Sequence, residues 1–263
     1  MKILRALILL LFAACAMVLT AGAANAAPGH DSTCSGGTVA SGTYHNLIIS
    51  GICTLPDHAT VTVNGNLALT RASTLNAMTA STVTIRGNVL VAPEATLSLG
   101  CSFALTQPPF PGGPVFCPVG VSHDVVWGSI LANRPHTLKI DGITIHRNLV
   151  SVGGGTAVTG PTASTCEEHP APLNFPVKDN TINGDVLISG WQGCWLGYIR
   201  NVQGGSAVIA GNRTADADST EIVTNTITGS LICLANSPAP QIGDSMGLAN
   251  TVSGHKIGQC ARL

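Results

Sequence analysis

The chain of 263 residues is poor in charged and aromatic side chains: Asp, Glu, Lys and Arg make up 10% of it, and Phe, Trp and Tyr 4%. No run of basic residues occurs, and 12 Lys and Arg are balanced by 13 Asp and Glu, which argues against binding to nucleic acid. The residues that usually fill helix surfaces are scarce, so long helices are disfavoured. Because 45% of the residues are hydrophobic, the chain can bury a core. We therefore expect a folded protein with little helix.

Residues 1–26 have the pattern of an export signal. A positively charged start precedes an apolar run from Leu7 to Leu19, and Ala24-Asn25-Ala26 offers a small-x-small cleavage site. Cleavage there would leave one domain, residues 27–263, secreted or held at the cell surface. A retained membrane anchor is the alternative. No later stretch is long and apolar enough to span a membrane, so we expect no span once the signal is removed.

The cysteines support an extracellular setting. Cys15 lies in the signal, where lipid modification is a further alternative, and the eight cysteines that follow are an even number in an exported chain, which predicts disulfides. Zinc binding is disfavoured because no closely spaced Cys pair occurs. Eight cysteines allow many connectivities, and the sequential one is our preferred hypothesis: Cys34–Cys53, Cys101–Cys117, Cys166–Cys194 and Cys233–Cys260.

A short unit recurs along the chain: a β-branched strand, a Gly-Asn or Gly-Asp corner, and a second apolar strand. The clearest copies begin at Val61 (VTVNGNLAL) and Val83 (VTIRGNVLV), and looser copies begin at Ile143, Asn180, Asn225 and Asn250. The steps between copies are 22, 60, 37, 45 and 25 residues, which we interpret as one, three, two, two and one coils. Such periods are typical of solenoids, in which one rung cannot bury its apolar side alone but a stack can.

The unit predicts a right-handed parallel β-helix. The β-branched residues point inward between polar neighbours, and the corner residues tolerate a left-handed backbone. Equivalent positions should then stack into columns, one of corner Asn and Asp residues (Asn66, Asn88, Asn148 and Asp185) and one of threonines (Thr62, Thr84, Thr144, Thr181, Thr226 and Thr251). An antiparallel β-sandwich is the alternative fold.

From about Thr38 to Cys260, these Thr-Ile-x-Gly-Asn/Asp-Val/Leu units and Gly-rich corners resemble the exported bacterial proteins with right-handed parallel β-helix repeats. The resemblance implies the fold. The best-known proteins of this fold are polysaccharide lyases and hydrolases, but none of their catalytic motifs matches a residue of this sequence, so no catalytic residue is carried over.

Two proline-rich stretches interrupt the repeat. Thr106–Pro118 and Gly160–Pro176 each hold several prolines, which cannot donate to a strand ladder, so both are expected to leave the rungs as loops. Insertions in solenoids often gather on a binding face, although tolerated surface insertions are the simpler interpretation.

The candidate ligand-binding residues lie in two clusters. Trp191, Trp195, Tyr198 and Arg200 could line a groove for a glycan, or the aromatic rings could fill the core beside Cys194. The carboxylates of Asp216, Asp218 and Glu221 could bind Ca²⁺ or form a glycosidase pair, or they could belong to a solvated turn. We expect no cofactor, with Ca²⁺ as the one alternative, and no metal site among the eight histidines, whose spacing matches no metal motif.

These features favour an exported, disulfide-stapled β-solenoid with a structural role or a role in binding a polysaccharide or cell-wall surface. The alternative is a carbohydrate-active enzyme, a lyase or glycosidase, on the same fold, and this rests on analogy between folds. The two hypotheses differ in one observable feature: an enzyme needs the aromatic and acidic residues to converge in one groove.

Overall fold

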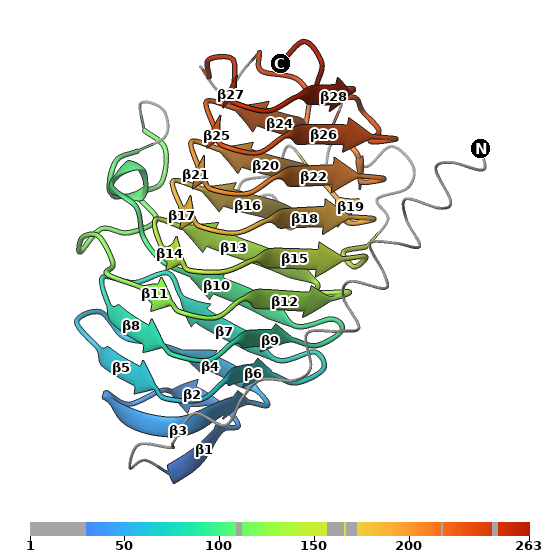
Figure 1. The fold of residues 1–263 in the computed structure, drawn as a ribbon. Helices are drawn as coiled ribbons and strands as arrows, with labels where there is room; N and C mark the ends of the chain where they lie inside the picture. The colour runs from blue at the N-terminus through green and yellow to red at the C-terminus, as the bar shows by residue number, and fades with distance from the viewer. Residues whose placement is uncertain (1–29, 109–111, 157–165, 167–172, 217, 244–246) are drawn as a thin grey trace.

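The computed structural model describes residues 30–108, 112–156, 166, 173–216, 218–243 and 247–263. They form a parallel β-solenoid of about nine turns with almost no helix (Figure 1). The chain runs from left to right along the front strands of Figure 1, returns from right to left behind them, and rises by one level per turn, which makes the coil right-handed. The predicted β-helix is confirmed, and the sandwich alternative is wrong, since the strand pairs are parallel.

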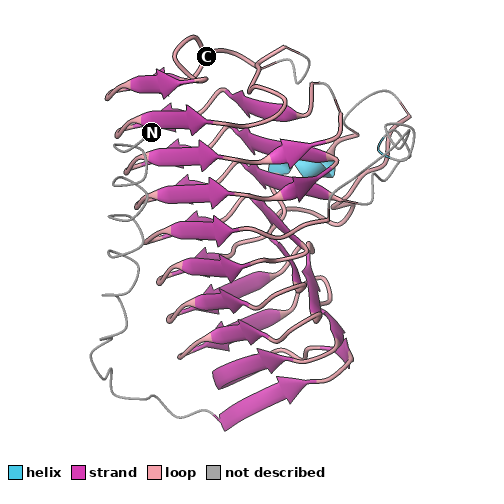
Figure 2. Ribbon diagram, turned by 90° about the vertical axis from the view of Figure 1, so that its right-hand side faces the viewer, coloured by secondary structure: helices cyan, strands magenta, loops and turns pink. Residues whose placement is uncertain are grey.

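Each turn contributes strands to three faces, and the strands of one face stack along the axis (Figure 2). β1 (His30–Cys34) begins the stack, and β3 (Gly42–Ile49) spans the first and second faces. The first face continues with β5 (Thr60–Val63), β8 (Thr82–Ile85), β11 (Val125–Val126), β14 (Thr144–Ile145), β17 (Thr181–Ile182), β21 (Val202–Gln203), β25 (Thr226–Ile227) and β27 (Thr251–Val252). The second face continues with β6 (Leu67–Leu69), β9 (Val89–Val91), β12 (Ile130–Asn133), β15 (Leu149–Val152), β18 (Val186–Ser189), β22 (Ala207–Ala210), β26 (Leu231–Leu234) and β28 (Lys256–Gly258).

The third face closes the cross-section. It holds β2 (Gly37–Thr38), β4 (Ile52–Thr54), β7 (Thr74–Ala77), β10 (Thr96–Leu99), β13 (Thr137–Asp141), β16 (Asn174–Lys178), β20 (Trp195–Ile199) and β24 (Thr220–Val223). A short extra pair, β19 (Gln192–Gly193) and β23 (Arg213–Thr214), lies between the second and third faces in the chain. The inward side chains of the three faces form one mostly aliphatic core that continues through the stack.

The threonine column follows from strand alternation. On the first face Val83 and Ile85 point into the core while Thr84 points outward, and Thr84 pairs with Thr62 below it and Val125 above it. The predicted column is confirmed, with valines in place of threonine in two of its turns.

The corner between the first and second faces holds a second column. Asn66 Oδ1 accepts the N–H of Asn88 (2.8 Å), and Asn88 Oδ1 accepts the N–H of Ser129 (2.9 Å) in the following turn. Asn148 and Asp185 continue the column, as predicted, and serines fill three of its turns. Gly87 precedes Asn88 because a Cβ there would collide with the backbone oxygen below it. Each corner therefore caps the backbone of the next one.

The number of coils between some copies is smaller than predicted. The step of 60 residues holds two coils, β8 to β11 to β14, and the step of 37 residues holds one, β14 to β17. The surplus residues lie in the two proline-rich stretches, which add length without adding a rung. The predicted numbers of coils were too high because they assumed coils of constant length, and the residues of the two stretches were therefore taken for rungs.

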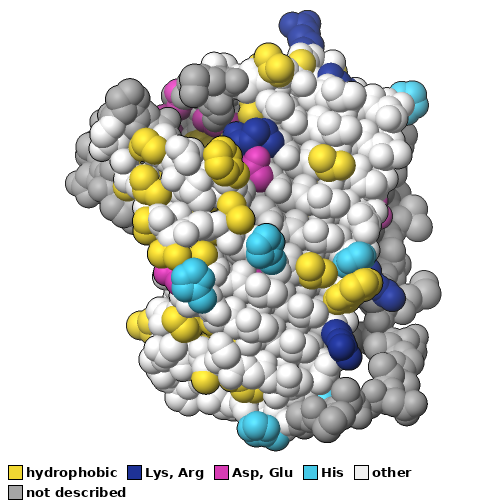
Figure 3. All heavy atoms as spheres, turned by 90° about the vertical axis from the view of Figure 1, so that its left-hand side faces the viewer, with side chains coloured by type: hydrophobic (Ala, Val, Ile, Leu, Met, Phe, Trp, Pro, Cys, Tyr) yellow, Lys and Arg dark blue, Asp and Glu magenta, His cyan; other side chains and the backbone are white. Residues whose placement is uncertain are grey.

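The chain leaves the solenoid after Cys101 and passes through the short 3₁₀ helix η2 (Phe103–Thr106) into the first stretch, which contains Cys117. It carries several exposed hydrophobic side chains, and hydrophobic spheres gather on the protruding side of the otherwise mostly uncharged surface in Figure 3. Of the second stretch, residues 160–165 and 167–172 lie outside the described residues, whereas Cys166 is described and bonds to Cys194. The expectation of a loop up to Pro176 is wrong at its end, because Asn174, Phe175 and Pro176 belong to β16 and pair with β20.

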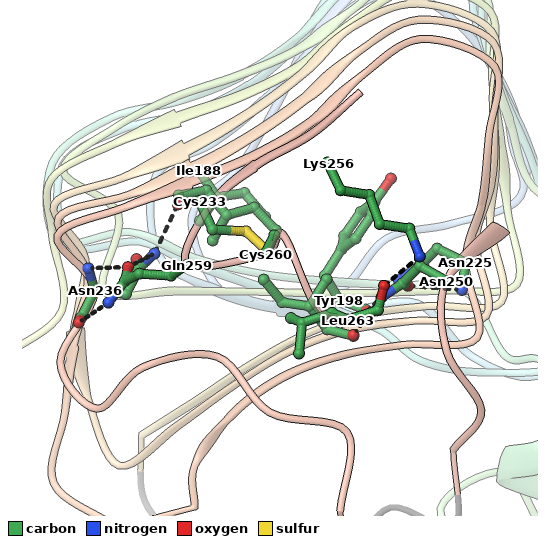
Figure 4. Close-up of a disulfide and its surroundings, with 12 residues drawn as sticks. Ile188, Tyr198, Asn225, Cys233, Asn236, Asn250, Lys256, Gln259, Cys260 and Leu263 are labelled. Carbon is green, nitrogen blue, oxygen red and sulfur yellow. Dashed lines mark hydrogen bonds between the residues drawn. A yellow bond between two sulfur atoms is a disulfide. The ribbon is translucent and has the colours of Figure 1, made fainter. Parts of the chain in front are cut away.

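All four disulfides have the predicted sequential pairing. At the C-terminal end, Cys233 of β26 bonds to Cys260, and both are fully buried. Gln259 bonds to Asn236 beside the disulfide, and Lys256 Nζ donates to the backbone oxygen of Leu263 (Figure 4). The last residues thus cover the C-terminal end of the core.

Candidate functional site

The predicted aromatic cluster divides between the core and the third face. Trp191 and Tyr198 are 0% exposed. The Trp191 indole packs against Phe175 and donates to the backbone oxygen of His136 (3.1 Å), and the Tyr198 hydroxyl donates to Gln203 (2.6 Å). Burial also raises the pKa of Tyr198. These two rings stabilise the core, which is the alternative that the sequence left open.

Trp195 and Arg200 lie on the outside of the third face. The Trp195 ring covers Gly197, where a Cβ would collide with it, and the ammonium of Lys178 lies 5.2 Å from the ring centroid. Arg200 donates from both Nε and Nη2 to the carboxylate of Asp179, each over 2.6 Å. This paired hydrogen bond raises the pKa of Arg200 and engages its guanidinium within the protein.

Around Lys178 the third face carries a network of buried charges. Asp141, which pairs with Lys178 in the ladder, is 2% exposed, and Glu221 is 5% exposed. Burial raises the pKa of Asp141 to about 6 and lowers the pKa of Lys178, while the attraction between them opposes both shifts. A network so enclosed resembles a structural ion cluster more than a groove open to a polymer.

The acidic turn follows β23. Asp216 is half-buried at the end of β23, and its backbone oxygen accepts the N–H of Ser219, whereas Asp218 is exposed and its backbone oxygen accepts Gln241 Nε2. Across the described ranges, no three His, Cys, Asp or Glu side chains lie close enough together to hold a metal ion. The structure brings Glu221 to the third face with Trp195 and leaves Asp216 and Asp218 in the turn.

An exposed aromatic platform lies elsewhere, on the first face. Trp127 directly follows β11, is 51% exposed, and its N–H donates to the backbone oxygen of Ile85 in the turn below (2.8 Å). Its indole stacks on the imidazole of His146 in the turn above, with ring centroids 4.0 Å apart and planes 1° from parallel. Asn183 Nδ2 lies 3.3 Å from His146 Nδ1, so three successive turns support the upright indole.

A shallow depression lies beside this ring. It is lined by Trp127, Val125, Thr84 and Arg86, and therefore opens on the side of the preceding turn. Since His146 covers one face of the indole, the opposite face borders the depression. That face, a guanidinium with several donors and a hydroxyl are thus available together to one ligand. We call this depression the Trp127 site.

Sequence reasoning missed the Trp127 site. Trp127 stands alone between Val126 and Gly128, whereas two other tryptophans drew attention by lying close together. A signal was nevertheless present: Trp127-Gly128 occupies the same corner position as Arg86-Gly87, so its side chain had to point outward. Whether an aromatic ring lies in the core or is exposed to a ligand depends on which residues it pairs with in the neighbouring turns.

The second face has an unusual outer side. In each of nine turns the central outward residue is aliphatic, and ladder pairing stacks these residues into one column: Ile48, Ala68, Leu90, Leu131, Val150, Leu187, Val208, Ile232 and Ile257. The outward column beside it holds uncharged residues, which in the central strands are Asn133, Val152, Ser189, Ala210 and Leu234. None of these side chains is charged.

Comparison with protein-family models, with curated proteins and with solved structures finds no match. Within the described ranges, no helix has both the length and the apolar character that crossing a membrane requires.

Proposed function

We propose that this chain is an exported β-solenoid that binds an acidic polysaccharide at the Trp127 site and that it acts by binding rather than catalysis. The observation that carries the proposal is the upright Trp127 indole, stacked on His146 and open on its other face beside Arg86. The carbon-bound hydrogens of a sugar ring form an apolar, slightly positive surface, which suits the negative face of an indole.

Arg86 selects an acidic sugar. Its guanidinium is planar and matches a carboxylate with two parallel hydrogen bonds. The outward residues that flank it in the neighbouring turns, Asn64 below and Trp127 above, carry no competing carboxylate. A uronic acid residue stacked on Trp127 would therefore meet a donor of opposite charge.

The shape of the first face suits a polymer better than a single sugar. The depression is shallow and bounded by only four residues, and the threonine column extends beyond it along the axis in both directions. A polysaccharide chain could follow these hydroxyls while one of its rings occupies the Trp127 site. The export pattern of residues 1–26 and the four disulfides support an extracellular setting for such a ligand.

The carboxylates argue for binding over hydrolysis. Glycosidases place two carboxyl groups on either side of the bond that they cleave. Asp141 and Glu221 are enclosed in the network around Lys178. The Trp127 site has no acidic lining residue.

The test is affinity electrophoresis of the purified protein in polygalacturonate, alginate and a neutral dextran. We expect retardation by the acidic polymers and, for Trp127→Ala, an affinity lower by about tenfold or more. Arg86→Gln should weaken binding to the acidic polymers selectively. Trp195→Ala, which removes the half-buried indole of the third face, is the matched control and should bind as the unchanged protein does.

Two results would contradict the proposal. Full binding by Trp127→Ala together with loss in Trp195→Ala would move the site to the third face. Release of new reducing ends during incubation with any of the polymers would favour the carbohydrate-active enzyme instead.

A further inference from the structure

The second strand of each repeat is apolar at three successive positions, as in Leu67-Ala68-Leu69, Val89-Leu90-Val91 and Val186-Leu187-Ile188. In a strand the first and third of these side chains point to one side and the second to the other. A strand that is apolar on both sides is typical of a sheet that is buried on both faces. The inner side of the second face lies on the core, so its outer side calls for an apolar partner.

The outer side of the second face is long enough to form a stable interface. Nine strands spaced about 4.8 Å apart span about 40 Å, and two outward columns give a width of about 15 Å. The face therefore offers about 600 Å² per copy, and two such faces together bury about 1,200 Å², which lies within the size range of specific interfaces.

A second copy of the same chain is the occupant that fits this face. Neither outward column carries a charged side chain, so two copies meet without repulsion and without burying an unpaired charge. Both surfaces have the same strand spacing, so their side chains can interdigitate along the whole column, as the facing sheets of a sandwich do. A two-fold axis between them makes the contact self-complementary and closed, so it ends at a dimer.

We propose that two copies of this chain associate face to face through the second face of the solenoid. Val150 is the fifth of the nine residues of the aliphatic column, so it lies opposite its own copy whether the two solenoids run in the same or in opposite directions. The proposal does not depend on the ligand of the Trp127 site, which lies on the first face.

Sedimentation velocity across a dilution series tests the association. We expect the unchanged protein to sediment as a dimer. Leu187→Asp places a carboxylate in the middle of the contact and should weaken dimerisation by about a hundredfold or more, since an unpaired charge would be buried. Thr181→Asp adds the same charge in the same turn but on the first face, and should remain dimeric. Circular dichroism establishes that each variant keeps the strand signal of the fold.

A cross-link gives a second, independent readout. Packed sheets lie about 10 Å apart, too far for a direct disulfide, so Val150→Cys is treated with a short bis-maleimide in a Cys15→Ser background. We expect a covalent dimer from Val150→Cys and none from Thr181→Cys. A protein that stays monomeric at every concentration and forms no cross-link at Val150 would overturn the proposal, and the face would then belong to another apolar occupant, such as the Leu7–Leu19 segment or a lipid surface.

Discussion

Asp124 is a buried carboxylate at a corner position that asparagines hold in later turns. It precedes β11, at the corner position that Asn180, Asn201 and Asn225 hold in later turns, and its Oδ1 accepts the N–H of Val83 (2.8 Å). Its Oδ2 has no hydrogen-bond partner in the part of the chain that the structure describes. Burial raises the pKa of Asp124 to about 7, although the hydrogen bond from Val83 opposes the shift.

This raised pKa makes stability fall as the pH rises. Below about pH 4 Asp124 is protonated in both states, whereas between about pH 4 and 7 the unfolded chain ionises first and is stabilised relative to the fold. Asp124→Asn cannot ionise, so above pH 7 we expect it to unfold with a free energy roughly 2–4 kcal/mol higher than that of the unchanged protein, with little difference near pH 4. Urea unfolding of the two proteins near pH 4 and above pH 7 measures the difference in the free energy of unfolding at each pH.

Asp31→Asn is the control with the opposite sign. Hydrogen bonds from His45 and Asn46 lower the pKa of the exposed Asp31 carboxyl, so its ionised form is favoured in the fold. This substitution should therefore reduce stability at neutral pH and lose its effect as the pH falls through the lowered pKa. An Asp124→Asn variant with the same deficit at pH 4 and pH 8 would contradict the burial argument.

At the scale of one residue, the sequence predicts which residues of a strand share a side better than it predicts which of them are exposed. Trp191, Trp195 and Tyr198 are close in sequence, yet alternation and the covering segments place Trp191 and Tyr198 in the core and Trp195 over Gly197. Trp127 follows the inward Val126 at the end of the short strand β11, so its side chain points outward. These outcomes depend on which residue pairs with which in the neighbouring turns, and one sequence does not reveal that register.

Among the strands and corners, the asparagines of the third-to-first corner form a continuous hydrogen-bonded column. Asn201 Oδ1 accepts both the N–H (3.1 Å) and the Nδ2 (3.0 Å) of Asn180, and Asn201 Nδ2 donates to the backbone oxygen of Val177 (2.9 Å). Asn225 and Asn250 repeat the arrangement in the next turns. These side chains satisfy backbone groups that the change of direction leaves without a ladder partner.

Asn201→Ala should therefore cost far more than its small change in volume suggests. It leaves buried donors of Asn180 without an acceptor, and we expect a loss of about 3 kcal/mol in the free energy of unfolding. Asn183→Ala, at an exposed position in the turn before, should change stability by about 0.5 kcal/mol or less. Equal losses in the two variants, measured by denaturant unfolding, would show that the column does not stabilise the fold.

The repeat unit predicts the elements well because each rung carries the same local physics. Val83-Thr84-Ile85 is inward-outward-inward, and the Gly87-Asn88 corner has room only for glycine before an amide that caps the next turn. The number of coils was harder to predict, since insertions such as Thr106–Pro118 change the spacing without changing the rung. In the sequence, most strands of the second face have three successive apolar residues. Only the pairing of these strands in the structure shows that their middle residues form one outer surface.

Across the whole molecule, the disulfides act at two kinds of place. Cys34–Cys53 and Cys233–Cys260 hold the first and last turns that the structure describes, each of which stacks on a described rung on one side only. Cys101–Cys117 and Cys166–Cys194 tie the two proline-rich stretches to the stack. In a solenoid each turn contacts only its neighbours, so unfolding can begin at an end and propagate.

Removing the terminal disulfide should therefore unfold the molecule from its C-terminal end. Closing a separation of 27 residues constrains the unfolded chain by about 3.5 kcal/mol, and the covering residues from Gln259 onward lose their tether in Cys233→Ala/Cys260→Ala. Hydrogen exchange should then become faster in β26 and β28 than in the central turns. Cys101→Ala/Cys117→Ala is the control. Its two cysteines are 16 residues apart, so it loses a constraint of similar size, but this constraint lies outside the rungs. Hydrogen exchange in this variant should therefore become faster in the loop alone. Uniformly faster exchange in both variants would mean that the solenoid unfolds as one cooperative unit, with its ends no weaker than its middle.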